Sequence, residues 1–142
     1  MVSHQRFTIL TDQYLQQIRI TEEVRKAVIS SGVVNGTVAV ITMHTTTGIT
    51  VNEDLECLES DIESALERLV PEDIPYSHAR MLHSYGSTAG NPTGHIKSML
   101  VGNHCLFPVM DGKVVLGGAQ DIFFCEFDGP SQRTYHITVM GE

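Results

Sequence analysis

Four histidines lie where predicted strands and helices end, and side chains at such positions can reach a cleft. His44 follows a predicted strand, His78 and His83 lie in an irregular segment, and His95 is in the first turn of a predicted helix. Imidazole is the commonest protein ligand for transition metals and serves as a general acid or base. The remaining three are interpreted as structural residues: His4, His104 and His136.

Metal binding is one chemistry that this group can support. His44, His83 and His95 can supply three ligands to a catalytic zinc ion, which leaves a fourth position for water or substrate. The sequence has no H-x-H, H-E-x-x-H or C-x-x-C spacing, so each histidine is equally well interpreted as a hydrogen-bonded polar residue. The cofactor suggested is a divalent metal, zinc or magnesium.

Acid–base residues end the run that His44 opens, His-Thr-Thr-Thr-Gly-Ile-Thr-Val-Asn-Glu. Glu53 is the candidate general base, Asn52 is placed to orient a substrate, and His44 completes the catalytic candidates. The alternative is that Glu53 only stabilises the start of the following helix, because a carboxylate there interacts favourably with the helix dipole.

Other polar residues are candidates for binding the substrate. Thr46 and Thr47 add hydroxyl groups to the same run, and Lys97, with Arg80, is the nearest cation to the histidine motifs. Gln120 follows a pair of glycines in a predicted strand, where glycine indicates a bulge or a close backbone approach.

Three charged residues surround a tight turn near the C-terminus: Glu126, Asp128 and Arg133. An ion pair that holds the turn together explains them most simply.

Hydrophobic patterning predicts the elements that position these residues. Strands are expected at 3–10, 16–20 and 37–44. Between the second and third strands, Thr21 is expected to cap a helix, and Gly32 is a natural residue to follow its end.

A longer amphipathic helix is expected next. Its apolar face is Leu55, Leu58, Ile62, Leu66 and Leu69, and its glutamates are Glu56, Glu59, Glu63 and Glu67. Because carboxylates one turn apart repel one another, the glutamates are interpreted as a solvated face.

The chain is irregular over 71–90, and Asn91-Pro92 then opens a helix that ends at Gly102. The inner face of this helix is expected to be Ile96, Met99 and Leu100. Strands follow at 105–109, 114–127 and 133–140, the first two joined by an Asp111-Gly112 hairpin. The prediction is one α+β domain, 1–142, with an antiparallel sheet or two-layer sandwich and helices on one side.

Composition excludes several classes of protein. The net charge of −8 with only nine scattered Lys and Arg residues argues against binding to nucleic acid or an anionic membrane. No apolar run approaches a membrane span, and the N-terminus lacks a secretory signal. Cys57, Cys105 and Cys125 are unpaired in number and are expected to be reduced, mostly buried thiols. The expected location is the cytoplasm.

Four ordered blocks resemble the YjbQ-type family, also named the secondary thiamine-phosphate synthase family. They are the run from His44 to Glu53, Asn91-Pro-Thr-Gly-His-Ile-Lys-Ser-Met-Leu-Val-Gly102, Pro108-Val with Gly112-Lys-Val-Val-Leu-Gly117, and Gln120-Asp-Ile-Phe-Phe-Cys-Glu-Phe-Asp-Gly-Pro130. The match spans nearly the whole chain. It implies a small α+β sandwich that assembles as a homotrimer, with a pocket near subunit boundaries.

The resemblance also assigns residues. It places the family's histidine before the threonines at His44, its Asn-Glu pair at Asn52 and Glu53, and a further histidine at His95. Another family histidine falls on His83 by spacing, with His78 as the alternative. The chain departs from the family where Ala119 replaces a tryptophan and where Ser131 and Gln132 interrupt a Pro-Arg run.

Three functions follow as hypotheses. The resemblance implies an enzyme that joins a pyrimidine-methyl diphosphate to a thiazole phosphate and releases diphosphate. The second is a metal-assisted hydrolase or lyase that acts on a small metabolite, with the three histidines as ligands and Glu53 as base. The third is a non-catalytic trimer that binds a metabolite or a metal.

Overall fold

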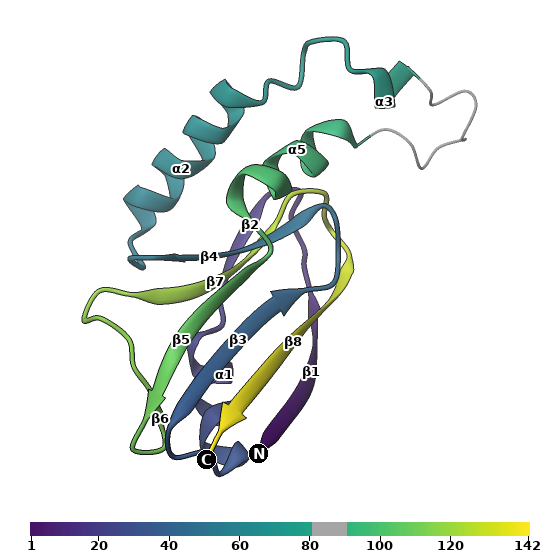
Figure 1. Ribbon diagram of the computed structural model, residues 1–142. Coiled ribbons are helices and arrows are strands. Elements are labelled where there is room, and N and C mark those ends of the chain that lie inside the picture. Colours follow the sequence, from purple (N-terminus) through teal and green to yellow (C-terminus); the bar gives the residue numbers. More distant parts are fainter. Residues whose placement is uncertain (81–90) are drawn as a thin grey trace.

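Two antiparallel sheets form the body of the molecule (Figure 1). The computed structural model describes residues 1–80 and 91–142. The larger sheet has the order β1 (Val2–Leu10), β8 (Gln132–Gly141), β3 (Gly36–Thr42), β5 (His104–Met110) and β6 (Lys113–Val114). The smaller sheet has the order β2 (Gln16–Arg19), β7 (Asp121–Glu126) and β4 (Thr47–Asn52). The prediction of an α+β fold with antiparallel sheets is confirmed.

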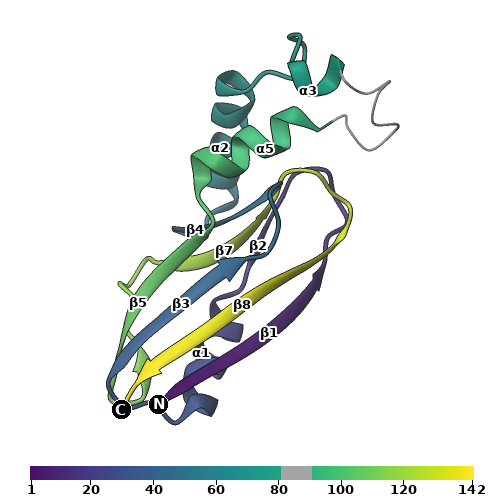
Figure 2. The same ribbon diagram turned by 45° about the vertical axis from the view of Figure 1, so that its right-hand side comes forward.

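The helices are distributed over both sheets: α1 packs in the main core against the larger sheet, and α5 packs against β4 of the smaller one. In both ribbon views, α1 (Thr21–Ser31) lies behind the larger sheet, whereas α2 (Glu56–Leu69) and α5 (Pro92–Val101) lie over the smaller one (Figures 1 and 2). The short helix α3 (Ser77–Arg80) lies near the start of α5. None of the helices in the described part of the chain is long and apolar enough to cross a membrane.

Strand β7 separates two hydrophobic clusters. Ile122 and Phe124 face the main core, which they share with β3, β5, β8 and α1. Phe123, Cys125 and Phe127 face the opposite way and pack against Leu66 of α2 and Val101 of α5. Because both faces of β7 are covered, its sequence is apolar almost without alternation.

Most element boundaries agree with the sequence-based expectation. Strands β1, β2, β3, β5 and β8 lie where they are predicted, and α1 and α5 begin and end within one residue of the predicted positions. Gly32 adopts the left-handed conformation (φ 75°) that ends α1, and Asp111-Gly112 forms the β5–β6 hairpin with φ of 53° and 76°.

Two local expectations are wrong. Residues 114–127 do not form one strand: β6 ends at Val114 and β7 begins at Asp121 in the other sheet. The glycines between them therefore lie in the connection between sheets, not in a bulge. No separate prediction was made for strand β4, which lies in the run that His44 opens. Thr21 does not cap α1, because its hydroxyl donates to Asp121 and accepts from the Ile122 N–H.

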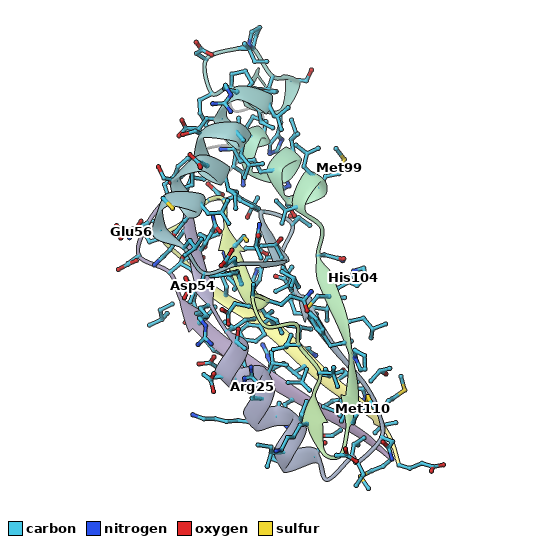
Figure 3. All side chains as sticks on the ribbon, turned by 90° about the vertical axis from the view of Figure 1, so that its left-hand side faces the viewer. Arg25, Asp54, Glu56, Met99, His104 and Met110 are labelled. Atoms are coloured by element: carbon cyan, nitrogen blue, oxygen red, sulfur yellow. The ribbon has the colours of Figure 1, made fainter. Side chains whose placement is uncertain are left out.

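The inner face of α5 also differs from the prediction. Its buried residues are Thr93, Gly94 and Lys97, whereas Met99 is 75% exposed and Leu100 is 52% exposed. Figure 3 shows Met99 pointing away from the molecule. The helix packs closely at Gly94, and two of its long apolar side chains, Met99 and Leu100, face outward.

Candidate functional site

A buried ion pair organises the end of the molecule where the β3–β4 and β7–β8 connections meet. The Glu126 carboxylate is fully buried and accepts two hydrogen bonds from Arg133, at 2.8 and 2.6 Å, and one from Thr11 at 2.7 Å. Burial alone would raise the pKa of Glu126, but the hydrogen bonds from Arg133 and Thr11 hold it below its ordinary value. Arg133 also donates to the Thr46 hydroxyl at 2.9 Å, which ties the two connections together.

His44 lies beside this ion pair. Its Nε2 accepts a hydrogen bond of 2.8 Å from the Thr134 N–H, so the ring proton of the neutral imidazole is on Nδ1. Burial, and then the positive charge of Arg133, lower the pKa of His44. A cavity of about 370 Å³ opens here, lined by Arg6, Met43, His44, Thr134 and His136.

His95 and His78 line a different cavity. Their ring centroids are 5.2 Å apart with the planes at 81°, and the cavity of about 430 Å³ is completed by Tyr76, Ser77, Pro92 and Ile96. The sequence left the choice between His83 and His78 open. The structure places His78 against His95, whereas His83 lies outside the described residues.

A hydrogen-bonded chain orients His78. The Asn91 Nδ2 donates to Asp128 Oδ2 at 2.8 Å, and Asn91 Oδ1 lies 2.9 Å from His78 Nε2. Because the bond to Asp128 fixes the Asn91 amide, the Asn91 oxygen accepts a hydrogen bond from the His78 Nε2–H group. In the neutral imidazole Nδ1 is then the unprotonated nitrogen, the type of atom that accepts a hydrogen bond or binds a metal. Asn91 does not cap α5 with its side chain, because its amide oxygen and nitrogen are hydrogen-bonded to His78 and Asp128.

Asn52 and Glu53 lie at the opposite end of β4 from His44. Five residue steps of an extended strand separate Thr47 from Asn52, or roughly 17 Å. Both side chains are exposed, and Asn52 Oδ1 accepts from the Glu53 N–H at 2.9 Å. Within a single chain, Asn52 and Glu53 therefore do not lie near His44.

The threonines and Gln120 make internal hydrogen bonds. Thr46 and Thr47 are buried, and the Thr47 hydroxyl pairs with Thr42 at 2.6 Å. The exposed Gln120 side chain accepts from the Gly117 N–H at 2.8 Å and closes the loop between β6 and β7. In this chain each of the three polar groups thus has a structural partner.

Lys97 is fully buried on α5. Its ammonium lies 3.5 Å from Glu72 Oε1 and 6.0 Å from the centre of the Tyr14 ring. Four residues that make these contacts were not assigned to a site from the sequence: Glu72, Tyr14, Asn91 and Asp128. No sequence pattern connects them, because they come from four separate segments.

The described residues do not contain three His, Cys, Asp or Glu side chains close enough to hold a metal. Among residues 1–80 and 91–142, His78 and His95 are two adjacent candidate ligands without a third. The three cysteines are free thiols. Burial raises the pKa of Cys105 and Cys125 to about 12, so both stay protonated and are poor nucleophiles.

Comparisons with known proteins give one consistent family. The family model described as "UPF0047 protein YjbQ-like" matches residues 5–142. A UPF0047 protein of Methanothermobacter thermautotrophicus is 36% identical over 97% of this chain and 92% of its own length. The UPF0047 protein YugU of Bacillus subtilis is 37% identical over 94% of this chain and 96% of its own.

Solved structures share the fold over the whole chain. The crystal structure of a YbjQ-like protein of unknown function from Sulfolobus solfataricus superposes with a TM-score of 0.90 at 28% identity, covering 100% of this chain and 99% of that one. A YjbQ/UPF0047 family protein of Clostridium acetobutylicum gives 0.86 at 35% identity, covering 96% and 99%.

Proposed function

Because the chain belongs to the YjbQ-like UPF0047 family, we propose that it is a cytoplasmic enzyme that acts on a small metabolite in the cavity lined by His78 and His95. One observation carries the proposal. The Asp128–Asn91–His78 chain orients an imidazole at the wall of a cavity of about 430 Å³, with a second imidazole beside it. A carboxylate that orients a histidine through a hydrogen-bonded partner is a recurring feature of metal and acid–base sites.

Metal-assisted hydrolysis or lyase chemistry is the reaction class that this arrangement supports best. His95 is one ligand of a divalent metal, zinc or magnesium, and His83 or His78 is the second. When bound, the ion supplies an activated water or a polarised substrate oxygen. His44 completes the set of three only if a neighbouring copy supplies it, because His44 and His95 line separate cavities.

A neighbouring copy is also the source that we propose for Asn52 and Glu53. The pair is exposed at the far end of β4, so it is available to a second chain, where Glu53 acts as the base and Asn52 orients the substrate. This requires an oligomer, and we propose a homotrimer. Exposed apolar residues at the two ends of α2 support it: Leu55, just before the helix, is 45% exposed and Leu69, its last residue, is 70% exposed.

Thiamine-phosphate synthesis is the second candidate, and the cavity walls favour it. Tyr76, Pro92 and Ile96 provide flat, apolar surfaces that suit a heteroaromatic ring such as pyrimidine or thiazole. The reaction needs diphosphate to be neutralised as it leaves. The proposed substrate-binding residues are Lys97, Thr46, Thr47 and Gln120, and each needs to exchange its internal partner for the substrate.

Metal analysis and turnover separate these proposals. We expect purified protein to contain a divalent metal, and His95→Ala and His78→Ala to lose at least about tenfold in metal affinity and in turnover. Glu53→Ala is expected to keep the metal and lose turnover. His104→Ala is the matched control, because His104 is exposed and its ring is hydrogen-bonded to the neighbouring Asn103.

The substrates distinguish the reactions. Diphosphate release that requires both thiamine precursors supports synthesis, whereas hydrolysis or elimination of single metabolites supports the metal-assisted class. A protein that binds metal or metabolite stoichiometrically without turnover is the third, non-catalytic function, and it contradicts the proposal of an enzyme.

A further inference from the structure

Three hydrogen-bond donors converge on one carboxylate oxygen next to α5. Glu72 Oε1 accepts from the Tyr14 hydroxyl at 2.9 Å and from the Thr93 hydroxyl at 2.9 Å, and the Lys97 ammonium lies 3.5 Å away. The donors come from the β1–β2 connection and from two successive turns of α5. We call Tyr14, Thr93 and Lys97 the donor cage.

Lys97 is not explained by its contacts within the chain. Its side chain is 0% exposed, and its ammonium has no hydrogen-bond acceptor among residues 1–80 and 91–142. An ammonium carries three N–H donors, and a fully buried one is costly unless it is paired and hydrogen-bonded. The ion pair with Glu72 and the face of the Tyr14 ring compensate the charge only in part.

Glu72 reaches the donor cage from the surface. Its side chain is 52% exposed, so its carboxylate can turn into water without unfolding any element. Burial is the main cause that raises the pKa of Tyr14, so the hydroxyl stays a donor when the carboxylate leaves. The donors would then surround a position suited to a negatively charged oxygen.

We propose that the donor cage binds an oxyanion group of a ligand, a phosphate ester or a carboxylate, and that Glu72 competes with the ligand for this position. Charge-assisted hydrogen bonds to an ammonium and two hydroxyls are the interactions that such groups favour. Thr93 adjoins Pro92, which lines the His78 and His95 cavity, so a metabolite with an anionic group can span both. The proposal does not depend on which reaction occurs there.

Anion binding to the full chain tests the proposal directly. Inorganic phosphate and acetate are titrated at constant ionic strength set with chloride, and binding is measured by calorimetry and by the shift in Tm. We expect Glu72→Gln to bind one or both anions about tenfold more tightly than the wild type, because the competing charge is gone. The anion that binds identifies the source of the oxyanion.

Matched variants decide whether the donor cage is the site. Combining Lys97→Met with Glu72→Gln is expected to abolish the gain, since Met fills the same space without a charge. Glu56→Gln removes the same charge from an exposed position of α2 and is expected to bind as the wild type does. Glu72→Gln that binds neither anion more tightly, or a gain that survives Lys97→Met, overturns the proposal.

Two further variants keep the test decisive if Lys97→Met does not fold. Tyr14→Phe and Thr93→Val each remove one hydroxyl and leave the ammonium. In the Glu72→Gln background, each is expected to weaken anion binding several-fold. Unchanged binding in both variants contradicts the donor cage.

Discussion

Three features of its environment favour the neutral form of the His44 imidazole. Half-burial disfavours the imidazolium, the nearby Arg133 repels it, and the Thr134 N–H occupies Nε2, the atom that would gain the proton. The first two lower its pKa, and the third adds a hydrogen bond that only the neutral ring can accept. In one chain His44 is therefore placed to accept a hydrogen bond on Nε2 and to donate one from Nδ1.

A lowered pKa makes His44 a source of acid sensitivity. Between its lower folded pKa and its higher unfolded pKa, the unfolded chain binds more protons, so the free energy of unfolding falls as pH falls. Above the unfolded value, near 6.5, the contribution of His44 is fully present. We expect urea denaturation at a series of pH values to show a shallower acid loss in His44→Gln, whose amide oxygen can still accept from Thr134.

His104 provides the comparison for this experiment. It is exposed and its ring is hydrogen-bonded to the adjacent Asn103, so His104→Gln is expected to keep the acid loss of the wild type. If the free energy of unfolding depends on pH equally in His44→Gln and the wild type, His44 is not a source of the acid sensitivity.

Among the elements, α5 determines where the candidate site forms, and Gly94 determines how closely α5 approaches the β7–β8 turn. A Cβ at Gly94 would lie 2.9 Å from the Phe127 carbonyl oxygen and 3.3 Å from Thr46 Cγ2. This close approach brings Asn91 to Asp128 and so orients His78. The glycine is needed for its small size, not for an unusual backbone conformation.

Gly94→Ala is therefore expected to destabilise the protein, although Ala favours helix formation by about 1 kcal/mol over Gly. The added methyl group forces α5 away from the backbone of the turn, at a cost of roughly 1–3 kcal/mol before that gain. Urea denaturation measures the difference. Gly118→Ala is the control, since nothing lies within 4 Å of its added Cβ. A Gly94→Ala protein more stable than the wild type contradicts the close packing of α5.

At the scale of the whole molecule, α2 is packed on one side only. None of its residues is buried, and only Ile62 and Leu66 line the cavity of about 130 Å³ between this helix and the smaller sheet. The expected apolar face is thus present but half covered in one chain. Figure 1 shows α2 lying at the edge of the molecule, where a second copy can reach it.

The proposed homotrimer predicts that a charge on this face weakens association. Leu69→Glu is expected to lower the association constant at least about tenfold, since burying one Leu contributes about 1.5–3 kcal/mol. Light scattering coupled to size-exclusion chromatography measures the mass over a range of concentrations. Ile29→Glu is the control on α1, where Ile29 is 67% exposed.

The two outcomes that count against the trimer differ. A monomeric wild-type protein contradicts the oligomer itself and removes the proposed source of the second chain's Asn52 and Glu53. A trimeric Leu69→Glu protein excludes only the end of α2 from the interface.

Local patterns in the sequence were sufficient for most elements. Alternating apolar residues predict β1 and β8, and Asp111-Gly112 predicts the hairpin, because such signals act over a few neighbouring residues. The prediction of the buried face of α5 failed because contacts with distant segments of the chain outweigh the local pattern of apolar residues. Lys97 is on the buried face of α5, beside Glu72 and the Tyr14 ring, whereas Met99 is on the outer face.

The sequence by itself determined the family, the antiparallel α+β class and the histidines worth considering. Only the tertiary structure decided which of them meet: His78 lies against His95 and bonds through Asn91 to Asp128, while His44 lies beside Arg133 and the Asn52–Glu53 pair lies at the other end of β4. The physical reason is that hydrogen bonds and ion pairs depend on distance in space, and these partners come from segments that the chain brings together only when both sheets have formed.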